Sequence, residues 1–465
     1  MIRSAINASN VNQLHLSWHY TTHDYVTGEP LVMDQTVYGY DWQGYLYFLD
    51  LNSGKLLYNR QLYKPAQSSK FISKIPLLSN YLSQPLPYLW NGFAGSGCIV
   101  GNLLYLGSVG SKPGKPLQNG SAGEFFIINR HDGKTLFREK LVLTPYSGNI
   151  SALIADDKFI YIGVSSCEEI VEVVSKLLFK PFHPLSVGHV IAYEQESGKR
   201  QWSQRTIGLL PNDPPNAKGA SVWGGFAIDS LNHLLFFGTG NNYGEPTSQS
   251  SDSFIALNSV NGELKWQYQV TKGDGWLPLK RKGPDYDFGG TPTLFSVIQN
   301  GRTIPAVGIG NKNGHFYTFN RLEGSLLWET NCNVNSESDD GIRSRASFHE
   351  QRLYIWSKNK KPKNTLTACC LDANTGKVIW SHILKGTNAM SSGALINDLY
   401  FIPTYSGQLY ALSIKDGNLL WTGEIPGASI GSNITVTPHQ LLMGVGVPAL
   451  YGGNPKQYGI YTFSL

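Results

Sequence analysis

Charged residues are scarce in this sequence. They make up 15% of its 465 residues, and the net charge of +5 is spread along the whole chain. Lysine and arginine form no basic run, so no nucleic-acid partner is expected. Hydrophobic residues make up 41%, which provides material for a sizeable core and excludes a largely disordered chain.

Cysteine is also scarce, and long apolar runs are missing. The five cysteines include no CxxC and no CxxCH pattern, which excludes a zinc ribbon and a c-type haem attachment site. No apolar run approaches the roughly 18 residues that a membrane-spanning helix needs, so no membrane span is expected. The first residues, MIRSAINASNVNQLHLSW, lack the apolar core of a signal peptide. We therefore expect a chain that stays in the cell, or a mature or truncated form.

Glycine and aromatic residues, in contrast, are abundant. The chain has 50 Gly, 11 Trp, 25 Tyr and 20 Phe. This combination indicates many short strands joined by tight turns. A chain of this length often forms two or three domains, but repeat proteins build longer single units, so internal repeats decide the organisation.

Seven segments of the chain share one template. Each has a turn glycine with an aromatic residue four positions after it and a bulky apolar residue five positions before it. The glycines are Gly54, Gly133, Gly198, Gly262, Gly324, Gly376 and Gly417. Such a glycine supplies a turn with positive φ between two alternating strands, which predicts a β-hairpin in every copy. Successive glycines lie 41 to 79 residues apart, enough for a four-stranded blade.

The two ends of the chain contain strand patterns without this hairpin. NVNQLHLSWHY, which carries Trp18, lies at the N-terminal end, and ITVTPHQLLMGVGV and YGIYTFSL lie at the C-terminal end. Pairing them closes an eighth blade and removes an open sheet edge. The sequence thus predicts an all-β fold, an eight-bladed β-propeller of four-stranded antiparallel blades, as a single domain over residues 1–465. A seven-bladed ring is the alternative, but it leaves the terminal strands without partners.

Two features stand apart from the strand pattern. The clearest helical stretch is EEIVEVVSKLLF. The adjacent Cys369 and Cys370 suggest redox chemistry, but they occupy template positions that are filled by Tyr47 and Phe48 in another copy. Alternation along a strand points them to opposite faces, so we expect a packing role.

The template resembles the repeat of the pyrroloquinoline quinone (PQQ) enzymes, and its copies cover nearly the whole chain. The segments between the blades look most like those of polyvinyl alcohol dehydrogenases and, more distantly, of methanol-type quinoprotein dehydrogenases. Non-catalytic propellers, notably outer-membrane assembly lipoproteins, share the repeat. The repeat therefore predicts a fold, and function depends on residues at the mouth of the ring.

Residues 163–169, GVSSCEE, are similar to the family's Ser-Ser-x-x-Glu segment. The resemblance implies that Ser166 contacts the quinone and that Glu169 binds calcium. Glu168 is the alternative metal ligand, because a slip of one residue reverses which side chain faces inward. A solvated acidic loop end is the structural alternative for the segment.

Residues 219–243 contain Trp223, which has no place in the template and is followed by Gly224 and Gly225. It looks like the family's tryptophan that forms a flat floor for the quinone, where a large π-surface stacks favourably. Asn241 falls where the family has an asparagine calcium ligand. The structural alternatives are a core tryptophan and a turn asparagine.

Residues 284–292, PDYDFGGTP, resemble the family's D-x-D-F/Y-G motif. The resemblance implies that Asp287 is the general base for the alcohol proton and approaches the metal, and that Asp285 lies at the cofactor. Lys312 stands where relatives carry Arg or Lys near the quinone carbonyls, and it would stabilise negative charge on their oxygens during catalysis. An aspartate-rich turn and an exposed lysine are the structural alternatives.

Together these segments imply a PQQ- and Ca²⁺-dependent alcohol dehydrogenase that transfers hydride from secondary or polymeric hydroxyls to the quinone, since hard oxygen ligands suit Ca²⁺. The sequence has no haem domain, so an external electron acceptor such as a cytochrome c is implied, and the family implies the periplasm. Two departures stand out. Only Cys98 occupies the region of a vicinal disulfide in methanol-type enzymes, and Gly95-Ser96-Gly97 replaces an arginine of the relatives.

A non-catalytic propeller that serves as a binding or assembly scaffold is the alternative function. Residues 61–94, rich in Pro, Ser, Leu and Tyr, would be its interaction surface, or else a lid on the ring. A sugar or polymer binder without redox chemistry is a third possibility. Convergence of the predicted site residues around one central cavity would favour the enzyme, and their scattering would favour the scaffold.

Overall fold

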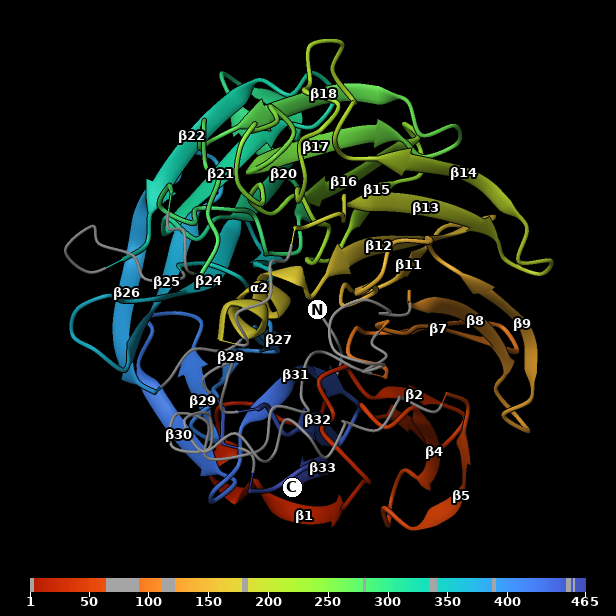
Figure 1. The fold of residues 1–465 in the computed structure, drawn as a ribbon. Coiled ribbons are helices and arrows are strands. Elements are labelled where there is room, and N and C mark those ends of the chain that lie inside the picture. The colour runs from red at the N-terminus through yellow and green to blue at the C-terminus, as the bar shows by residue number, and fades with distance from the viewer. Residues whose placement is uncertain are drawn as a thin grey trace.

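The computed structural model describes residues 4–63, 92–110, 122–177, 183–278, 282–333, 341–386, 390–448, 453–454 and 456–465. These residues form eight antiparallel sheets arranged as blades around a central axis (Figure 1). The predicted eight-bladed propeller is therefore confirmed. Most of the segment 61–94, considered above as an interaction surface or lid, lies outside the described residues.

Blades 1 to 4 follow the chain from the first repeat. Blade 1 contains β2 (Leu31–Met33), β3 (Thr36–Tyr40), β4 (Tyr45–Asp50) and β5 (Leu56–Gln61). Blade 2 contains β6 (Cys98–Val100), β7 (Leu103–Gly107), β8 (Glu124–Asn129) and β9 (Thr135–Lys140). Blade 3 has five strands, β10 (Ser147–Gly148), β11 (Ile154–Ala155), β12 (Phe159–Ser166), β13 (His189–Glu194) and β14 (Arg200–Arg205). Blade 4 contains β15 (Ala227–Asp229), β16 (Leu234–Gly238), β17 (Ser253–Asn258) and β18 (Leu264–Gln269).

Blades 5 to 8 complete the ring. Blade 5 contains β19 (Thr293–Gln299), β20 (Arg302–Gly310), β21 (His315–Asn320) and β22 (Leu326–Asn331). Blade 6 contains β23 (Ser347–His349), β24 (Arg352–Lys358), β25 (Thr365–Asp372) and β26 (Val378–Lys385). Blade 7 contains β27 (Ala394–Ile396), β28 (Leu399–Pro403), β29 (Gln408–Ser413) and β30 (Leu419–Glu424). Blade 8 combines β31 (Ile430–Val436), β32 (Gln440–Val445) and β33 (Gly459–Ser464) with β1 (His15–Tyr20).

Blade 8 joins the two ends of the chain. The N-terminal strand β1 pairs antiparallel with β33, with Leu16 opposite Phe463 and Tyr20 opposite Ile460. This pairing is the closure that the terminal strand patterns predicted. It gives the edge of β33 a hydrogen-bonded partner and leaves no gap in the ring.

The template glycine and aromatic residue form the contact between neighbouring blades. Gly324, with φ +75°, lies against the indole ring of Trp266 from the preceding blade. Nε1 of Trp266 donates a hydrogen bond to the backbone oxygen of Arg321, 3.0 Å away. Trp202, Trp328 and Trp380 repeat this arrangement at their own blade interfaces. The repeat thus encodes the packing of each blade against the next.

The same glycine–aromatic contact joins blade 1 to blade 8, where Gly54 lies against Trp18, and it gives a stability prediction. Gly54 has φ +66°, and a Cβ built on it would lie 2.4 Å from Cε3 of Trp18. We expect Gly54→Ala to lower the free energy of unfolding by about 2 to 4 kcal/mol, from left-handed backbone strain and overpacking. Gly101→Ala is the matched control, because Gly101 has φ +56° but no described atom lies within 4 Å of the position that its Cβ would take. Chemical denaturation of both variants measures the difference, and equal losses would refute the contact.

Cys369 and Cys370 point to opposite sides of β25. Cys369 packs in the core between blades 5 and 6, with Leu353 and Ile355, whereas Cys370 packs between blades 6 and 7, with Tyr400. Both are free thiols, and burial raises the pKa of Cys370 to about 12. The predicted packing role is confirmed.

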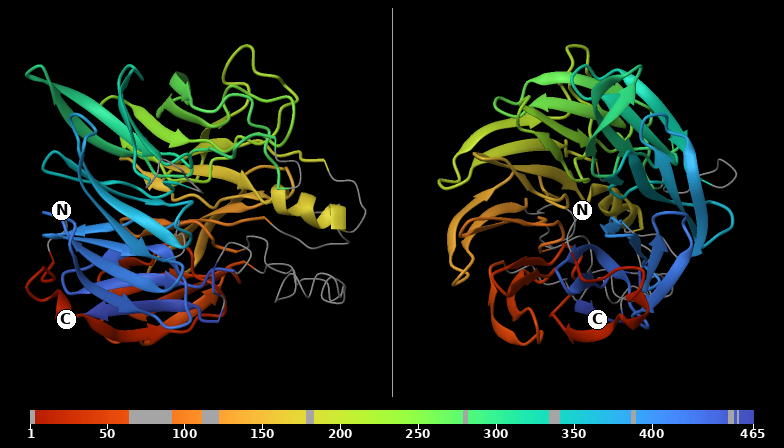
Figure 2. Two further views of the ribbon diagram at one scale, coloured as in Figure 1. Left: turned by 90° about the vertical axis from the view of Figure 1, so that its left-hand side faces the viewer. Right: turned by 180° about the vertical axis from the view of Figure 1, so that it is seen from behind.

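The predicted helical stretch forms α2 (Glu168–Leu177), directly after β12, and a short 3-10 turn η1 covers Val11–Gln13. Figure 2 shows α2 projecting from one face of the ring. Within the described ranges, no helix is long and apolar enough to cross a membrane.

The predicted site residues lie in loops at the ends of strands in blades 3 to 5. Trp223 precedes β15, and Asp285 and Asp287 precede β19. Ser166 ends β12 and Glu169 follows it, Asn241 follows β16, and Lys312 follows β20.

Candidate active site

The two adjacent glutamates at the start of α2 have different surroundings. Glu168 is only 1% exposed. Its carboxylate accepts hydrogen bonds from the backbone nitrogens of Leu185 (3.0 Å) and Ser186 (2.8 Å). Glu168 therefore fixes the chain that leads into β13. These contacts do not point to the metal-ligand role that was the alternative for Glu168.

Glu169 faces the other predicted site residues instead. Its carboxyl group forms a hydrogen bond with Asn241 and interacts electrostatically with Lys312, Asp285 and Asp287. Burial raises the pKa of Glu169 to about 8, the positive charge of Lys312 opposes this rise, and the two aspartates add to it. The structure thus brings together five of the predicted residues from blades 3, 4 and 5.

Lys312 lies between the two aspartates of the DYD sequence. Its Nζ is 2.6 Å from Oδ1 of Asp287 and 2.9 Å from Oδ1 of Asp285. The exposed fractions of the three side chains are 11% for Lys312, 3% for Asp287 and 21% for Asp285. Water screens these charges weakly, so the ammonium group is held firmly in the cluster and is not an exposed turn lysine.

Trp223 is joined to the same cluster. Its Nε1 donates a hydrogen bond to Oδ2 of Asp287, 3.0 Å away, and Nζ of Lys312 lies 5.3 Å from the ring centroid. A Cβ on Gly289 would lie 1.7 Å from Cη2 of the indole, so the ring can take this position only beside a glycine. Trp223 is half-buried. It is therefore not an ordinary core tryptophan.

The two aspartates differ in how their oxygens are used. Both oxygens of Asp287 have close partners, one on Trp223 and one on Lys312. Asp285 has one oxygen on Lys312, and its backbone adopts φ +62°. The backbone nitrogen of Asp285 donates to Oδ2 of Asp274, which fixes this unusual conformation. Asp285 is thus the more accessible of the two carboxylates.

A network of hydroxyl groups supports the end of β12. The Ser166 hydroxyl lies 3.0 Å from the Tyr243 hydroxyl, which lies 2.9 Å from the hydroxyl of Ser221. All three belong to the segments that the sequence singled out, although Tyr243 and Ser221 were assigned no role. Ser166, the predicted quinone contact, is therefore anchored to blade 4.

A further carboxyl group is buried behind the cluster. Asp252 is fully buried, and burial together with the negative charges of Asp287 and Asp274 raises its pKa well above the ordinary value. Sequence reasoning missed this residue, because it lies in a Ser-rich turn that resembles an ordinary surface loop. Only the folding of that turn towards Asp287 and Asp274 reveals it.

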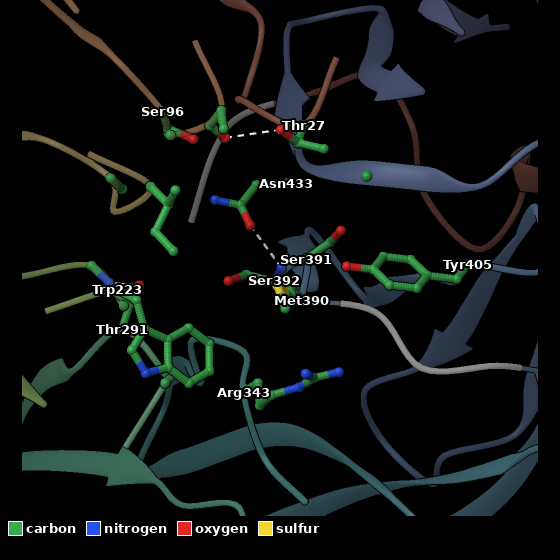
Figure 3. Close-up of a pocket in the computed structure, with 18 residues that line it drawn as sticks. Thr27, Ser96, Trp223, Thr291, Arg343, Met390, Ser391, Ser392, Tyr405 and Asn433 are labelled. Carbon is green, nitrogen blue, oxygen red and sulfur yellow. Dashed lines mark hydrogen bonds between the residues drawn. The ribbon is translucent and has the colours of Figure 1, made fainter. Parts of the chain in front are cut away.

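A cavity lies along the ring axis beside the cluster. Its volume is about 90 Å³, and its wall comes from all eight blades. Figure 3 shows Trp223, Arg343 and Tyr405 on its wall. Trp223 belongs to this wall and is bonded to Asp287 of the charged cluster, and Gly289 of the wall lies against its indole. Arg343 is a second residue that the sequence did not indicate, since no repeat or motif marks it.

The two departures from the relatives, at Gly95-Ser96-Gly97 and at Cys98, lie in or near this cavity. Gly95 and Ser96 line the cavity where relatives were expected to carry an arginine. Cys98 lies in β6 as a free thiol, and burial raises its pKa to about 12. Cys98 is therefore a neutral packing residue at ordinary pH.

The charged cluster contains oxygen donors but no complete metal-binding group of its own. Among the described residues, no group of three or more His, Cys, Asp or Glu side chains is placed to hold a metal ion. The ammonium group of Lys312 lies between two of the carboxylates. A cation here would need the amide oxygen of Asn241 or the oxygens of a bound ligand in addition to Glu169.

Two protein-family profiles match the chain. The profile described as "Glucose/ethanol/alcohol dehydrogenase, beta-propeller domain" matches residues 167–341, which contain the charged cluster. The profile described as "Outer membrane protein assembly factor BamB" matches residues 295–444. The two regions overlap in blade 5, and together they span most of the ring.

Characterised relatives agree with the first profile. A polyvinyl alcohol dehydrogenase from a Pseudomonas species is 20% identical over 453 residues, which cover 90% of this chain and 64% of the relative. Another, from a Sphingopyxis species, is 24% identical over 275 residues, which cover 50% of this chain and 41% of the relative. The chain thus spans less than two thirds of the length of these two relatives.

Solved structures show the same architecture. A europium-containing methanol dehydrogenase superposes with a TM-score of 0.73 and 17% sequence identity, covering 99% of this chain and 95% of the other. At this identity the similarity concerns the fold. The repeats, the profiles and the relatives together show that this chain is similar to the PQQ-repeat propellers of the quinoprotein dehydrogenases.

Proposed function

We propose that this chain is a PQQ-dependent alcohol dehydrogenase that oxidises secondary or polymeric hydroxyl groups. The convergence of Glu169, Asn241, Asp285, Asp287 and Lys312 into one buried cluster carries the proposal. These residues come from three blades and lie far apart in the sequence. Packing alone does not require three carboxylates, an amide and an ammonium group at one point, because buried charges are costly unless they have a function or compensating partners.

The residues around the axis suit a planar quinone. Trp223 offers an indole surface on the cavity wall, and neighbouring Gly224, Gly225 and Gly289 keep bulky side chains away from it. A flat aromatic ligand stacks favourably on such a surface. Lys312 is held close to this ring and would meet the quinone oxygens there.

The donor set suits a hard cation, which we propose to be Ca²⁺. Glu169, Asn241 and Asp287 would bind it, since carboxylate and amide oxygens are ligands that Ca²⁺ prefers. A structural neighbour is named for europium, so lanthanide ions belong in the same test. Oxygen atoms of the quinone would supply the remaining ligands of the cation.

When bound, the metal and PQQ would supply a polarised quinone carbonyl able to accept hydride from the alcohol carbon. Asp287 accepts the hydroxyl proton of the alcohol as the general base. Lys312 holds the reacting carboxylate in place and balances negative charge that develops on the quinone oxygens. Trp223 would stack against the quinone, and it orients Asp287 through its Nε1.

Asp285 is a second candidate for the base. Its side chain is 21% exposed, whereas that of Asp287 is 3% exposed and has partners at both oxygens. An alcohol that reaches the cluster from solvent meets the more exposed carboxylate first. The assignment between the two aspartates is therefore part of the test of mechanism.

Reconstitution tests the proposed function directly. Purified protein is incubated with PQQ and either Ca²⁺ or a trivalent lanthanide, and dye reduction is followed with secondary alcohols and with polyvinyl alcohol. We expect alcohol-dependent dye reduction that requires both the quinone and a metal. No quinone binding at micromolar concentration would rule the proposal out.

Metal binding is expected to depend on pH. The pKa of Glu169 is raised to about 8, so the group is protonated below this pH and must lose its proton to bind a cation. Apparent Ca²⁺ affinity should therefore rise about tenfold per pH unit up to about pH 8 and level off above it. Calorimetric titration from pH 6 to pH 9 measures this, and Glu169→Gln should bind weakly with a flat profile. An equally steep profile in that variant would assign the proton to another group.

The electron acceptor and the compartment follow from the same proposal. The chain would pass electrons to an external carrier such as a cytochrome c, and it would work in the periplasm, as its resemblance to PQQ enzymes implies. The scaffold function is the second candidate, because residues 295–444 match the assembly-factor profile. Absence of quinone binding together with binding of an outer-membrane protein partner would favour it.

A further inference from the structure

Two cysteines meet at the interface between blades 5 and 6, which lie side by side in the ring (Figure 1). Cys332 directly follows β22, the outer strand of blade 5, and Cys369 lies in β25 of blade 6. Both side chains are buried in one core cluster, and the Cys369 thiol interacts with the Cys332 thiol. This pair differs from the adjacent Cys369 and Cys370, which point to opposite sides of β25.

The repeat explains why these two positions meet. Cys332 lies eight positions after the turn glycine of blade 5, and Cys369 lies seven positions before the turn glycine of blade 6. The corresponding residues share a core cluster at four other blade interfaces: Leu62 with Phe126, Leu141 with Ile191, Val270 with Tyr317, and Leu384 with Tyr410. Among the repeat copies, cysteine fills both positions only between blades 5 and 6.

Neighbouring contacts keep the two thiols in place. Alternate residues of β22 point towards blade 6. Nε1 of Trp328 donates to the backbone oxygen of Ala373 (3.0 Å), and the Thr330 hydroxyl donates to the backbone oxygen of Gly376 (2.6 Å). Cys332 is the next residue on this side of the chain. Its thiol and that of Cys369 are therefore held together at a high effective concentration.

We propose that Cys332 and Cys369 form a disulfide that joins blades 5 and 6 when the chain folds in an oxidising compartment, of which the periplasm is one. The oxidant is a second disulfide, such as oxidised glutathione. Exchange forms the bond between the two sulfur atoms and cleaves the bond of the oxidant, which takes up two electrons and two protons and leaves as two thiols. This inference does not depend on dehydrogenase activity.

The exchange is expected during folding. The Cys332 thiol and burial raise the pKa of Cys369 well above its usual range. Cys369 is therefore a neutral thiol in the folded protein, and neutral buried thiols react slowly. Once formed, the disulfide is shielded from reductants by the same burial.

The disulfide would also fasten the turn that carries Lys312. The backbone nitrogen of Cys332 donates to the backbone oxygen of Gly314 (3.0 Å), and that of Ile342 donates to the backbone oxygen of Asn311 (3.0 Å). These two bonds lie on either side of Lys312. Fixing Cys332 to blade 6 therefore limits the movement of this turn.

Peptide mapping tests the proposal on the full chain, produced once in a host with a reducing cytoplasm and once in a host with an oxidising cytoplasm. Free thiols are alkylated in denaturant without reductant before digestion. Cys332→Ser and Cys369→Ser remove the bond. Cys370→Ser is the matched control, because its thiol is equally buried but faces blade 7. Thermal unfolding and amide hydrogen exchange are measured on both preparations.

We expect the oxidised wild type to lose two of its five free thiols and to yield one peptide that joins Cys332 to Cys369. Its unfolding midpoint should rise by about 3 to 8 °C over that of the reduced form, and exchange of the Cys332 amide should slow. Cys370→Ser should keep these changes, and the other two variants should lose them. Five free thiols in the oxidised preparation, or a bond to a different cysteine, would overturn the proposal.

Discussion

Replacing Asp287 by asparagine is expected to lower kcat by about 10³- to 10⁴-fold, at the upper end of what a general base contributes. Asparagine has nearly the same shape, and its Oδ1 can still accept the hydrogen bond from Nε1 of Trp223. The variant therefore removes the charge and basicity while keeping the indole in place. Steady-state dye reduction with a secondary alcohol measures kcat, and fluorescence titration measures PQQ affinity separately.

Asp285→Asn is the matched comparison, because both aspartates contact Lys312. If Asp287 is the base, Asp285→Asn should lower kcat about tenfold, by weakening the hold on Lys312. A reversed order of the two variants would make Asp285 the base, as its greater exposure suggests. Full activity in both would contradict a carboxylate base in this cluster.

The second large effect is expected from Gly289→Ala. Its methyl group would lie 1.7 Å from Cη2 of Trp223, far inside contact distance, so the indole must move. That movement breaks the bond to Asp287 and tilts the stacking surface in the cavity. We expect PQQ affinity to fall at least 100-fold, with about 1 to 3 kcal/mol lost in stability from overpacking.

Two further variants separate this clash from a general loss of fold. At Gly290 a Cβ would lie 3.1 Å from its nearest neighbour, the backbone oxygen of Ser344, so Gly290→Ala should bind PQQ nearly as the wild type does. Combining Gly289→Ala with Trp223→Phe removes the part of the indole that clashes. The double variant should regain stability but bind PQQ weakly, since the stacking surface is smaller. Equal losses in Gly289→Ala and Gly290→Ala would refute the role of the indole position.

The sequence alone determined the fold of this protein. Gly324 and Trp266 illustrate why: a glycine that must adopt positive φ and an aromatic at a fixed offset form the blade contact, and both recur seven times. Local periodicity of this kind needs no knowledge of distant contacts. The pairing of β1 with β33 was predictable for a related reason, since terminal strands in a ring have no other edge to pair with.

The sequence determined the candidate active site only in part. The motifs indicated Glu169, Asn241, Asp287, Lys312 and Trp223, but the direction of each side chain depends on how three blades pack. In the structure, the Glu168 side chain contacts the backbone that precedes β13, whereas the Glu169 side chain faces the charged cluster. A shift of one residue along the chain would exchange these two directions. It also gave both oxygens of Asp287 partners and left Asp285 more exposed.

Other residues became visible only through tertiary structure. Asp252 lies in a turn of ordinary composition, and only the fold shows that it is buried near Asp287. Arg343 belongs to no motif, and only the closed ring places its loop at the axis. Burial and long-range proximity are properties of the whole ring, and no local pattern encodes them. The repeats thus specified the ring, and the closure of the ring decided which polar side chains meet at its centre.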